Sequence, residues 1–176
     1  MEQRKKEQIT RKEIDMSIKE IALKYVGQKE ISGNRGFVEK EFDKKMRSVG
    51  FYTGAPWCGF FAKLVWSEAG QDTRLLRASS RQLISKASKA GNWHAEPKKG
   101  AVVVWATFKN GKRQTTGHIG IVTDVNGSKY STVEGNTTDK GGREGIMVAI
   151  RHREIRPEVW RTENGLRLMG FVYPNE

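Results

Sequence analysis

The thiol of Cys58, the only cysteine in this chain of 176 residues, is the strongest candidate nucleophile. Cys58 precedes an apolar run that is typical of a buried helix, so we expect the thiol at a helix N-terminus. The free N–H groups and partial positive charge there stabilise a thiolate and can also hold an oxyanion. The alternative is that Cys58 is a small core residue, since free cysteines are usually buried.

A thiol nucleophile is commonly activated by a neighbouring base, and the chain has three histidines. His118 follows Gly117 and begins an apolar run, so we expect it at the start of a strand, beside a glycine that lets another group approach. His94 lies in a polar segment and His152 in a charged run, and we interpret both as structural or surface residues. His118 is therefore the candidate base, although a lone histidine of this kind is more often structural.

Glu134 and Asn136 are candidates for the group that orients this histidine. They stand at the end of the apolar run that follows His118, in Glu134-Gly135-Asn136-Thr137. The start of one antiparallel strand adjoins the end of its neighbour, so we expect the Glu134 carboxylate within reach of the imidazole. Taken alone, Glu-Gly-Asn is an ordinary turn signal. Its placement opposite His118 favours the functional interpretation.

The elements that must position these residues are helices in the first half of the chain and strands in the second. Apolar spacing and caps predict helices at 9–26, 37–46, 57–69 and 79–90, with Phe37, Val38, Phe42 and Met46 on the apolar side of the second. Valine-rich and apolar runs predict strands at 101–107, 118–125, 130–134, 145–153 and 168–173, and polar, glycine-containing segments predict loops at 28–36, 108–117 and 136–142. This order predicts an α+β fold, with N-terminal helices packed on an antiparallel sheet.

Length and composition favour one globular domain. We expect residues 9–176 to form it and residues 1–8 to be a mobile basic tail, since the chain shows no linker or internal repeat. The net charge of +12 favours polyanionic partners, among them nucleic acid and the anionic polymers of a cell envelope. The charged N-terminus lacks the apolar core of a signal peptide, and no segment is long enough to span a bilayer. We therefore expect synthesis in the cytoplasm, without stable membrane insertion.

Three short motifs resemble those of the CHAP family, the cysteine, histidine-dependent amidohydrolases/peptidases. The nucleophile motif is similar to Ala55-Pro56-Trp57-Cys58-Gly59-Phe60-Phe61, the histidine motif to Gly117-His118-Ile119-Gly120-Ile121-Val122, and the acidic motif to Glu134-Gly135-Asn136-Thr137. The strand after Pro97 and the closing Gly170-Phe171-Val172-Tyr173-Pro174 also resemble the family's strands. The resemblance spans residues 18–174, most of the chain.

This resemblance implies a papain-like fold and hydrolysis of a peptidoglycan amide, either as an N-acetylmuramoyl-L-alanine amidase or as a stem or cross-bridge endopeptidase. It implies that Cys58 is the nucleophile, His118 the base and Glu134 the orienting group, with Asn136 assisting at the imidazole or near the oxyanion. Some members hold calcium through aspartates that precede the cysteine, but residues 47–54 contain no carboxylate. We therefore expect no metal ion. We also expect that the protein needs no cofactor and acts as a monomer.

An enzyme of this kind without an export signal would reach the bacterial cell wall through a membrane-pore protein (a holin) or a secretion apparatus. Three other interpretations stay open: the same fold acting on a non-wall amide or as an acyltransferase, an inactive wall-binding module, and a basic nucleic-acid-binding protein. The intact set of Cys58, His118 and Glu134 argues against the inactive module. The lack of zinc-ligand spacing and of a recognised nucleic-acid-binding motif argues against specific nucleic-acid binding.

Overall fold

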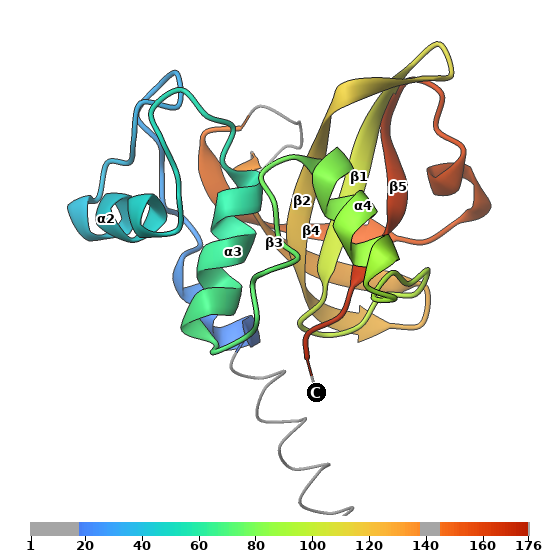
Figure 1. Cartoon of the computed structure of the whole chain (residues 1–176), viewed down its shortest axis with the longest axis horizontal. Coiled ribbons are helices and arrows are strands. Elements are labelled where there is room, and N and C mark those ends of the chain that lie inside the picture. The colour runs from blue at the N-terminus through green and yellow to red at the C-terminus, as the bar shows by residue number, and fades with distance from the viewer. Residues whose placement is uncertain (1–17, 138–144, 176) are drawn as a thin grey trace, which may run out of the picture.

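The computed structural model describes residues 18–137 and 145–175, in which helices precede a sheet (Figure 1). The helical segments are residues 18–24, α2 (Lys40–Ser48), α3 (Cys58–Glu68), α4 (Ser80–Lys89) and the short 3-10 helix η1 (Pro157–Trp160). The strands are β1 (Val102–Lys109), β2 (Lys112–Asn126), β3 (Lys129–Thr137), β4 (Met147–Glu154) and β5 (Gly165–Val172). Within the described residues, no helix is long and apolar enough to cross a membrane.

The five strands form one antiparallel sheet in the order β4-β3-β2-β1-β5. Helix α3 packs on β2 and β3 and helix α4 on β1 and β2, so the two helices cover the same side of the sheet (Figure 1). Helix α2 packs against α3 on the side away from α4. The predicted α+β arrangement, with N-terminal helices and an antiparallel sheet, is confirmed.

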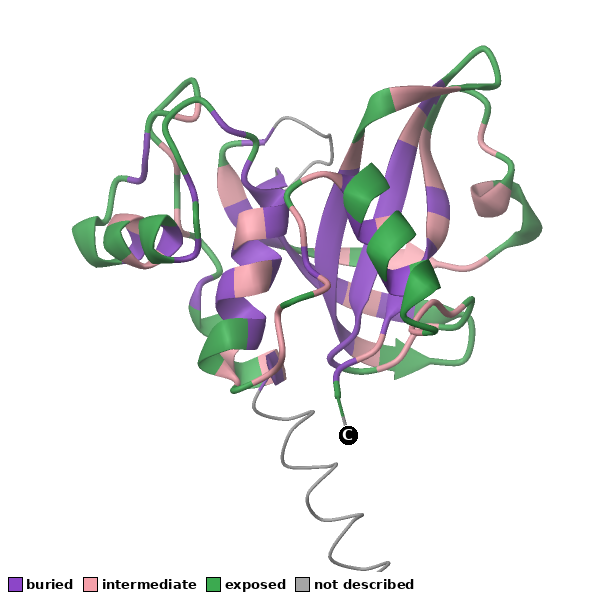
Figure 2. Cartoon of the chain, in the orientation of Figure 1, coloured by how far each residue is buried: buried purple, intermediate pink, exposed green. Residues whose placement is uncertain are grey.

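Apolar residues of β1 divide between two clusters, one on each face of the sheet. Val102 and Val104 belong to the main core beneath α3 and α4, whereas Val103 and Trp105 join a second cluster with Leu168 of β5. Figure 2 shows buried residues running along the central strands and along α3. Because both faces are covered, β1 is a continuous apolar run rather than an alternating one.

Helix α3 is apolar on nearly all sides because the sheet and the other helices enclose it. Phe61 and Trp66 are among its fully buried side chains, and the indole N–H of Trp66 donates to the carbonyl of Gly100 at 3.0 Å. The predicted buried helix at 57–69 is confirmed. It begins at Cys58, so the thiol stands in the first turn.

The strand that carries His118 begins earlier than the sequence predicts. Strands β1 and β2 form a hairpin whose turn contains Asn110 and Gly111, both with positive φ, and the strand pairing extends to Lys109↔Lys112. The predicted loop at 108–117 is therefore wrong, and His118 lies inside β2 instead of at its start. The polar residues pair because an Asn-Gly turn joins antiparallel strands with the twist that a hairpin needs.

Other element boundaries differ by a few residues. Helix α2 begins at Lys40, because the Glu39 carboxylate caps it, and Val38 therefore precedes the helix and is exposed instead of facing the core. Strand β3 continues through Asn136, so the predicted loop at 136–142 begins too early. The expected tail at 1–8, the first part of the expected helix at 9–26 and the rest of that loop lie outside the described residues.

Phe42 and Val38 provide a paired test of the α2 boundary. Phe42 is 1% exposed and Val38 is 67% exposed. We expect Phe42→Ala to lower the free energy of unfolding by about 3–5 kcal/mol, because it empties a core site, and Val38→Ala to change it by less than about 0.5 kcal/mol. Urea denaturation followed by circular dichroism measures both. Equal losses would contradict the exposure of Val38.

Candidate active site

Cys58 is the first residue of α3 and is 6% exposed. The preceding Trp57 occupies the N-cap position without a side-chain cap bond, so its indole leaves the N–H groups of the first turn uncapped. That indole is directed elsewhere: its N–H donates to a carboxylate oxygen of Glu30 at 2.7 Å. The thiol therefore stands where the helix offers open N–H groups and partial positive charge.

His118 and Glu134 form a buried hydrogen-bonded pair. The Nε2 atom of His118 lies 2.7 Å from an Oε2 atom of Glu134, and the two side chains are 1% and 0% exposed. The other ring nitrogen, Nδ1, is buried with no hydrogen-bond partner among the described residues. Because the carboxylate occupies Nε2, Nδ1 is the nitrogen left to exchange a proton with another group.

The charge state of this pair follows from its neighbours. Burial by itself lowers the pKa of His118, but the adjacent Cys58 sulfur and the Glu134 carboxylate outweigh burial and raise this pKa to about 9. Burial raises the pKa of Glu134, but hydrogen bonds from His118 and Thr132 and the charges of His118 and Arg153 bring that pKa down to about 2. An imidazolium and a carboxylate therefore coexist inside the protein. Cys58 therefore lies near enough to influence the His118 ring, although no hydrogen bond joins its sulfur to Nδ1.

Arg153 of β4 is a residue of this site that the sequence analysis missed. Its Nη2 atom lies 2.8 Å from each oxygen of Glu134, and its Nε atom lies 3.1 Å from Oε1. The same Oε1 atom accepts a hydrogen bond of 2.6 Å from the Thr132 hydroxyl. The charged run around His152 predicts a solvated surface, but the Arg153 side chain is only 24% exposed. The sequence contains no signal that singles out this arginine.

Trp105 contacts both the imidazole of His118 and the guanidinium of Arg153. Its ring stacks with the His118 ring at a centroid distance of 5.6 Å and a tilt of 28°. The Arg153 guanidinium lies 4.5 Å from the Trp105 ring centroid. The β1–β2 register places Trp105 opposite His118, which explains the stacking. Trp105 is buried, and its ring forms one wall against the histidine.

Asn136 stands near the end of β3 in a left-handed conformation, with φ of 53°. Its side chain is buried, and Asn136 lines the same cleft as Cys58 and His118. The Nε2 atom of His118 is already bonded to Glu134, so Asn136 does not orient the ring through that nitrogen. Asn136 was expected either at the imidazole or near the oxyanion, and its place in the cleft agrees better with a position near the oxyanion.

The cleft beside Cys58 has a volume of about 570 Å³. One side is formed by residues between the first described helix and α3, and the other by the start of α4 and the middle of β2. Its lining residues are Glu30, Gly33, Asn34, Tyr52, Ala55, Pro56, Cys58, Phe60, Ala78, Ser79, Ser80, Thr115, Thr116, Gly117, His118, Ile119, Asn136, Gly145 and Ile146. Glu134 lies behind this surface, so substrate in the cleft would meet Cys58 and His118 but not the carboxylate.

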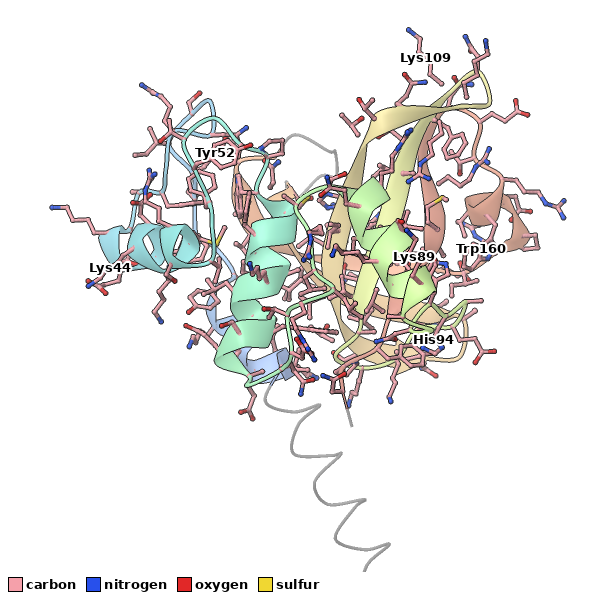
Figure 3. All side chains as sticks on the ribbon, in the orientation of Figure 1. Lys44, Tyr52, Lys89, His94, Lys109 and Trp160 are labelled. Atoms are coloured by element: carbon pink, nitrogen blue, oxygen red, sulfur yellow. The ribbon has the colours of Figure 1, made fainter. Side chains whose placement is uncertain are left out.

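The remaining histidines lie away from this cleft, as the sequence indicated. His94 stacks on Tyr173 at 3.7 Å, and Figure 3 shows it at the opposite end of the molecule from Tyr52, which lines the cleft. His152 is exposed and lies 3.0 Å from the hydroxyl of Ser131. Among residues 18–137 and 145–175, no group of three or more His, Cys, Asp or Glu side chains is placed to hold a metal ion.

Gly120 leaves the space that the Glu134 side chain occupies. A Cβ atom at position 120 would lie 2.8 Å from Cγ of Glu134, closer than side chains pack. We expect Gly120→Ala to displace the carboxylate and lower the pKa of His118, since the ring loses a nearby anion. The ring-proton shifts of His118, followed by NMR against pH, measure this change. Val125→Ala on the same strand is the control, and an unchanged titration in Gly120→Ala would contradict the expectation.

Comparison with known proteins agrees with this geometry. The model of the CHAP domain matches residues 50–136, a range that contains Cys58, His118, Glu134 and Asn136. No curated protein and no solved structure matches the chain. The CHAP domain indicates a hydrolase of the amidase or peptidase type. Residues 50–136 of this chain therefore form a CHAP domain.

Proposed function

We propose that this protein hydrolyses amide bonds of peptidoglycan through a thioester on Cys58. One observation carries the proposal: Cys58 and His118 line the same cleft, while the buried Glu134 occupies Nε2 of the ring and leaves Nδ1 free. This arrangement supports acyl transfer with Cys58 as nucleophile, His118 as base and Glu134 as orienting group. The proposal extends the amidase or peptidase class of the domain to a substrate and a mechanism.

The first half of the reaction forms the acyl-enzyme. Nδ1 of His118 takes the proton of Cys58, or holds it already as a thiolate–imidazolium pair, and the thiolate attacks the carbonyl carbon of the amide. The backbone N–H of Cys58, with a second donor from the cleft, stabilises the oxyanion of the tetrahedral intermediate. We assign Asn136 to this second position, because it lines the cleft and Glu134 already serves the ring. The imidazolium then protonates the departing amine, and the C–N bond breaks.

The second half releases the product. A water molecule gives a proton to Nδ1 of His118 and attacks the thioester carbonyl, and the C–S bond breaks to leave a carboxylic acid. Glu134 remains ionised throughout, since its pKa is held far below neutrality. It stabilises the imidazolium that forms in each half of the reaction and keeps Nε2 protonated, so that Nδ1 is the reactive nitrogen.

The whole-chain charge supports a cell-wall substrate. A net charge of +12 attracts the protein to the anionic polymers of a bacterial envelope. The bond cleaved would be the N-acetylmuramoyl-L-alanine amide or an amide of the stem or cross-bridge peptide. We further propose that the protein acts as a monomer, with neither metal nor cofactor, and that a holin-type pore or a secretion apparatus brings it to the wall.

Loss of the thiol tests the mechanism directly. We expect Cys58→Ala and Cys58→Ser to abolish clearing of purified cell walls in a zymogram, and His118→Ala to do the same because the thiol loses its base. Glu134→Ala should retain a small residual activity. His152→Ala, an exposed histidine outside the cleft, is the matched control and should clear normally. Clearing by Cys58→Ala at the wild-type level would disprove the thiol mechanism.

Product analysis of the digested wall separates the candidate bonds. An N-acetylmuramoyl-L-alanine amidase releases whole stem peptides from the glycan, whereas an endopeptidase exposes new N-termini within the peptides. New reducing ends would indicate glycosidic cleavage and would contradict amide hydrolysis.

The pH dependence of hydrolysis reports the state of His118. Protonated His118 is needed to protonate the leaving amine, so the rate should fall as the pH rises through about 9, where the ring loses its proton. Initial rates of wall-turbidity loss, measured between neutral and alkaline pH, provide the profile. In Glu134→Gln, the same fall should occur at lower pH, because removing the anion lowers the pKa of the ring. An unmoved alkaline limb in this variant would show that another group controls it.

A further inference from the structure

The guanidinium of Arg153 and the ring of His118 share one buried carboxylate. Oε2 of Glu134 accepts from His118 and from Arg153, and Oε1 accepts from Thr132 and from Arg153. Each carboxylate oxygen therefore has two donor residues, and they come from three adjacent strands. Contact with both oxygens gives the arginine a defined orientation that a single contact would not.

This sharing matters because His118 changes charge during the reaction and Glu134 does not. When His118 is neutral, the buried Glu134 loses its imidazolium partner, and an unpaired buried carboxylate is strongly disfavoured. Arg153 is then the cation that still faces it. With Arg153 in place, the carboxylate has no need to take a proton from Nε2, and the ring keeps the tautomer in which Nδ1 is free.

Through Trp105, the Arg153 guanidinium has a second, indirect contact with the His118 ring. The indole contacts both side chains: its ring is stacked with the imidazole and within cation–π distance of the guanidinium. The Arg153 side chain therefore supports the carboxylate that holds Nε2 and also the aromatic wall that the ring packs against. Both contacts restrict rotation of the imidazole.

We propose that Arg153 is a positioning residue of this active site, which keeps Glu134 ionised and the His118 ring aligned while the ring gains and loses its proton. The proposal rests on the function proposed for Cys58 and His118, because it assigns Arg153 a part in their proton transfer. Arg153 does not line the cleft, so it acts through Glu134 and Trp105 and has no contact with substrate there.

The titrating and charged groups around Glu134 and His118 determine what removal of Arg153 should do. They are Cys58 from α3, His118 from β2, Tyr130 and Glu134 from β3, and Arg153 itself from β4. Loss of a cation makes protonation easier at every neighbouring group, since the protonated form is the more positive one. Both proton-loss steps of the Cys58–His118 pair should therefore move to higher pH, whereas a purely structural arginine would leave them in place.

The rate of Cys58 alkylation by iodoacetamide, measured against pH, tests this without any wall substrate. The profile of the wild type should show two steps, one as the thiolate–imidazolium pair forms and one as the imidazolium loses its proton. In Arg153→Met we expect both midpoints to shift upward by about half a pH unit to one unit, and wall hydrolysis at neutral pH to fall by about 10- to 100-fold, as when partners that orient a reactive imidazole are removed. Unmoved midpoints in a folded Arg153→Met protein would overturn the proposal.

Two further variants separate the charge of Arg153 from its contact with both carboxylate oxygens and provide a surface control. Arg153→Lys retains the charge but loses the two-oxygen contact, so its midpoints should stay near those of the wild type while hydrolysis falls. Wild-type hydrolysis by Arg153→Lys would overturn the positioning role, even if Arg153→Met failed to fold. Arg156→Met removes an exposed arginine from the same region and should change neither readout.

The alkylation profile separates failure of this inference from failure of the proposed function. A wild-type protein that shows two alkylation steps but clears no cell wall would refute the peptidoglycan substrate and leave the role of Arg153 testable. If the alkylation steps do not move in Arg153→Met while the wild type clears cell walls normally, the positioning role of Arg153 is refuted and the proposed function stands.

Discussion

The burial of the Glu134 carboxylate is the constraint on which the rest of the active site depends. A fully buried carboxylate is strongly disfavoured unless it is paired and hydrogen-bonded on both oxygens. His118, Thr132 and Arg153 meet that need from β2, β3 and β4. The charge network is therefore part of the sheet, and three paired strands hold the imidazole more rigidly than a loop would.

The helix and the sheet contribute opposite halves of the chemistry. Helix α3 brings the thiol to an uncapped N-terminus, and β2 brings the candidate base. The two meet because the apolar body of α3 packs on β2 and β3. Buried residues such as Phe61 and Ile121 thus hold together two groups that lie 60 positions apart in the chain. Packing of the core therefore maintains the position of Cys58 relative to His118.

Close approach in this site depends on small residues at a few positions. Gly120 leaves room for the Glu134 side chain, and Gly117 lies against Ser80 at the start of α4. Gly59 similarly allows the Arg77–Ala78 backbone to pass the first turn of α3. These contacts bring α3, α4 and β2 together around the cleft. Two of these three glycines sit next to a catalytic candidate in the sequence, in Cys58-Gly59 and Gly117-His118.

The sequence by itself determined the local features: a buried helix that begins at Cys58, the α+β order, the approximate positions of the five strands, and the approach of Glu134 to His118. Apolar periodicity and antiparallel adjacency predict these because they depend on near neighbours along the chain. Only the tertiary structure decided that His118 lies inside a hairpin strand, that Glu134 takes Nε2 of the ring, and that Arg153 is buried against the carboxylate. Those features depend on strand register and on burial, which segments distant in sequence create together; an arginine in a charged run shows its partner only when the neighbouring strand is in place.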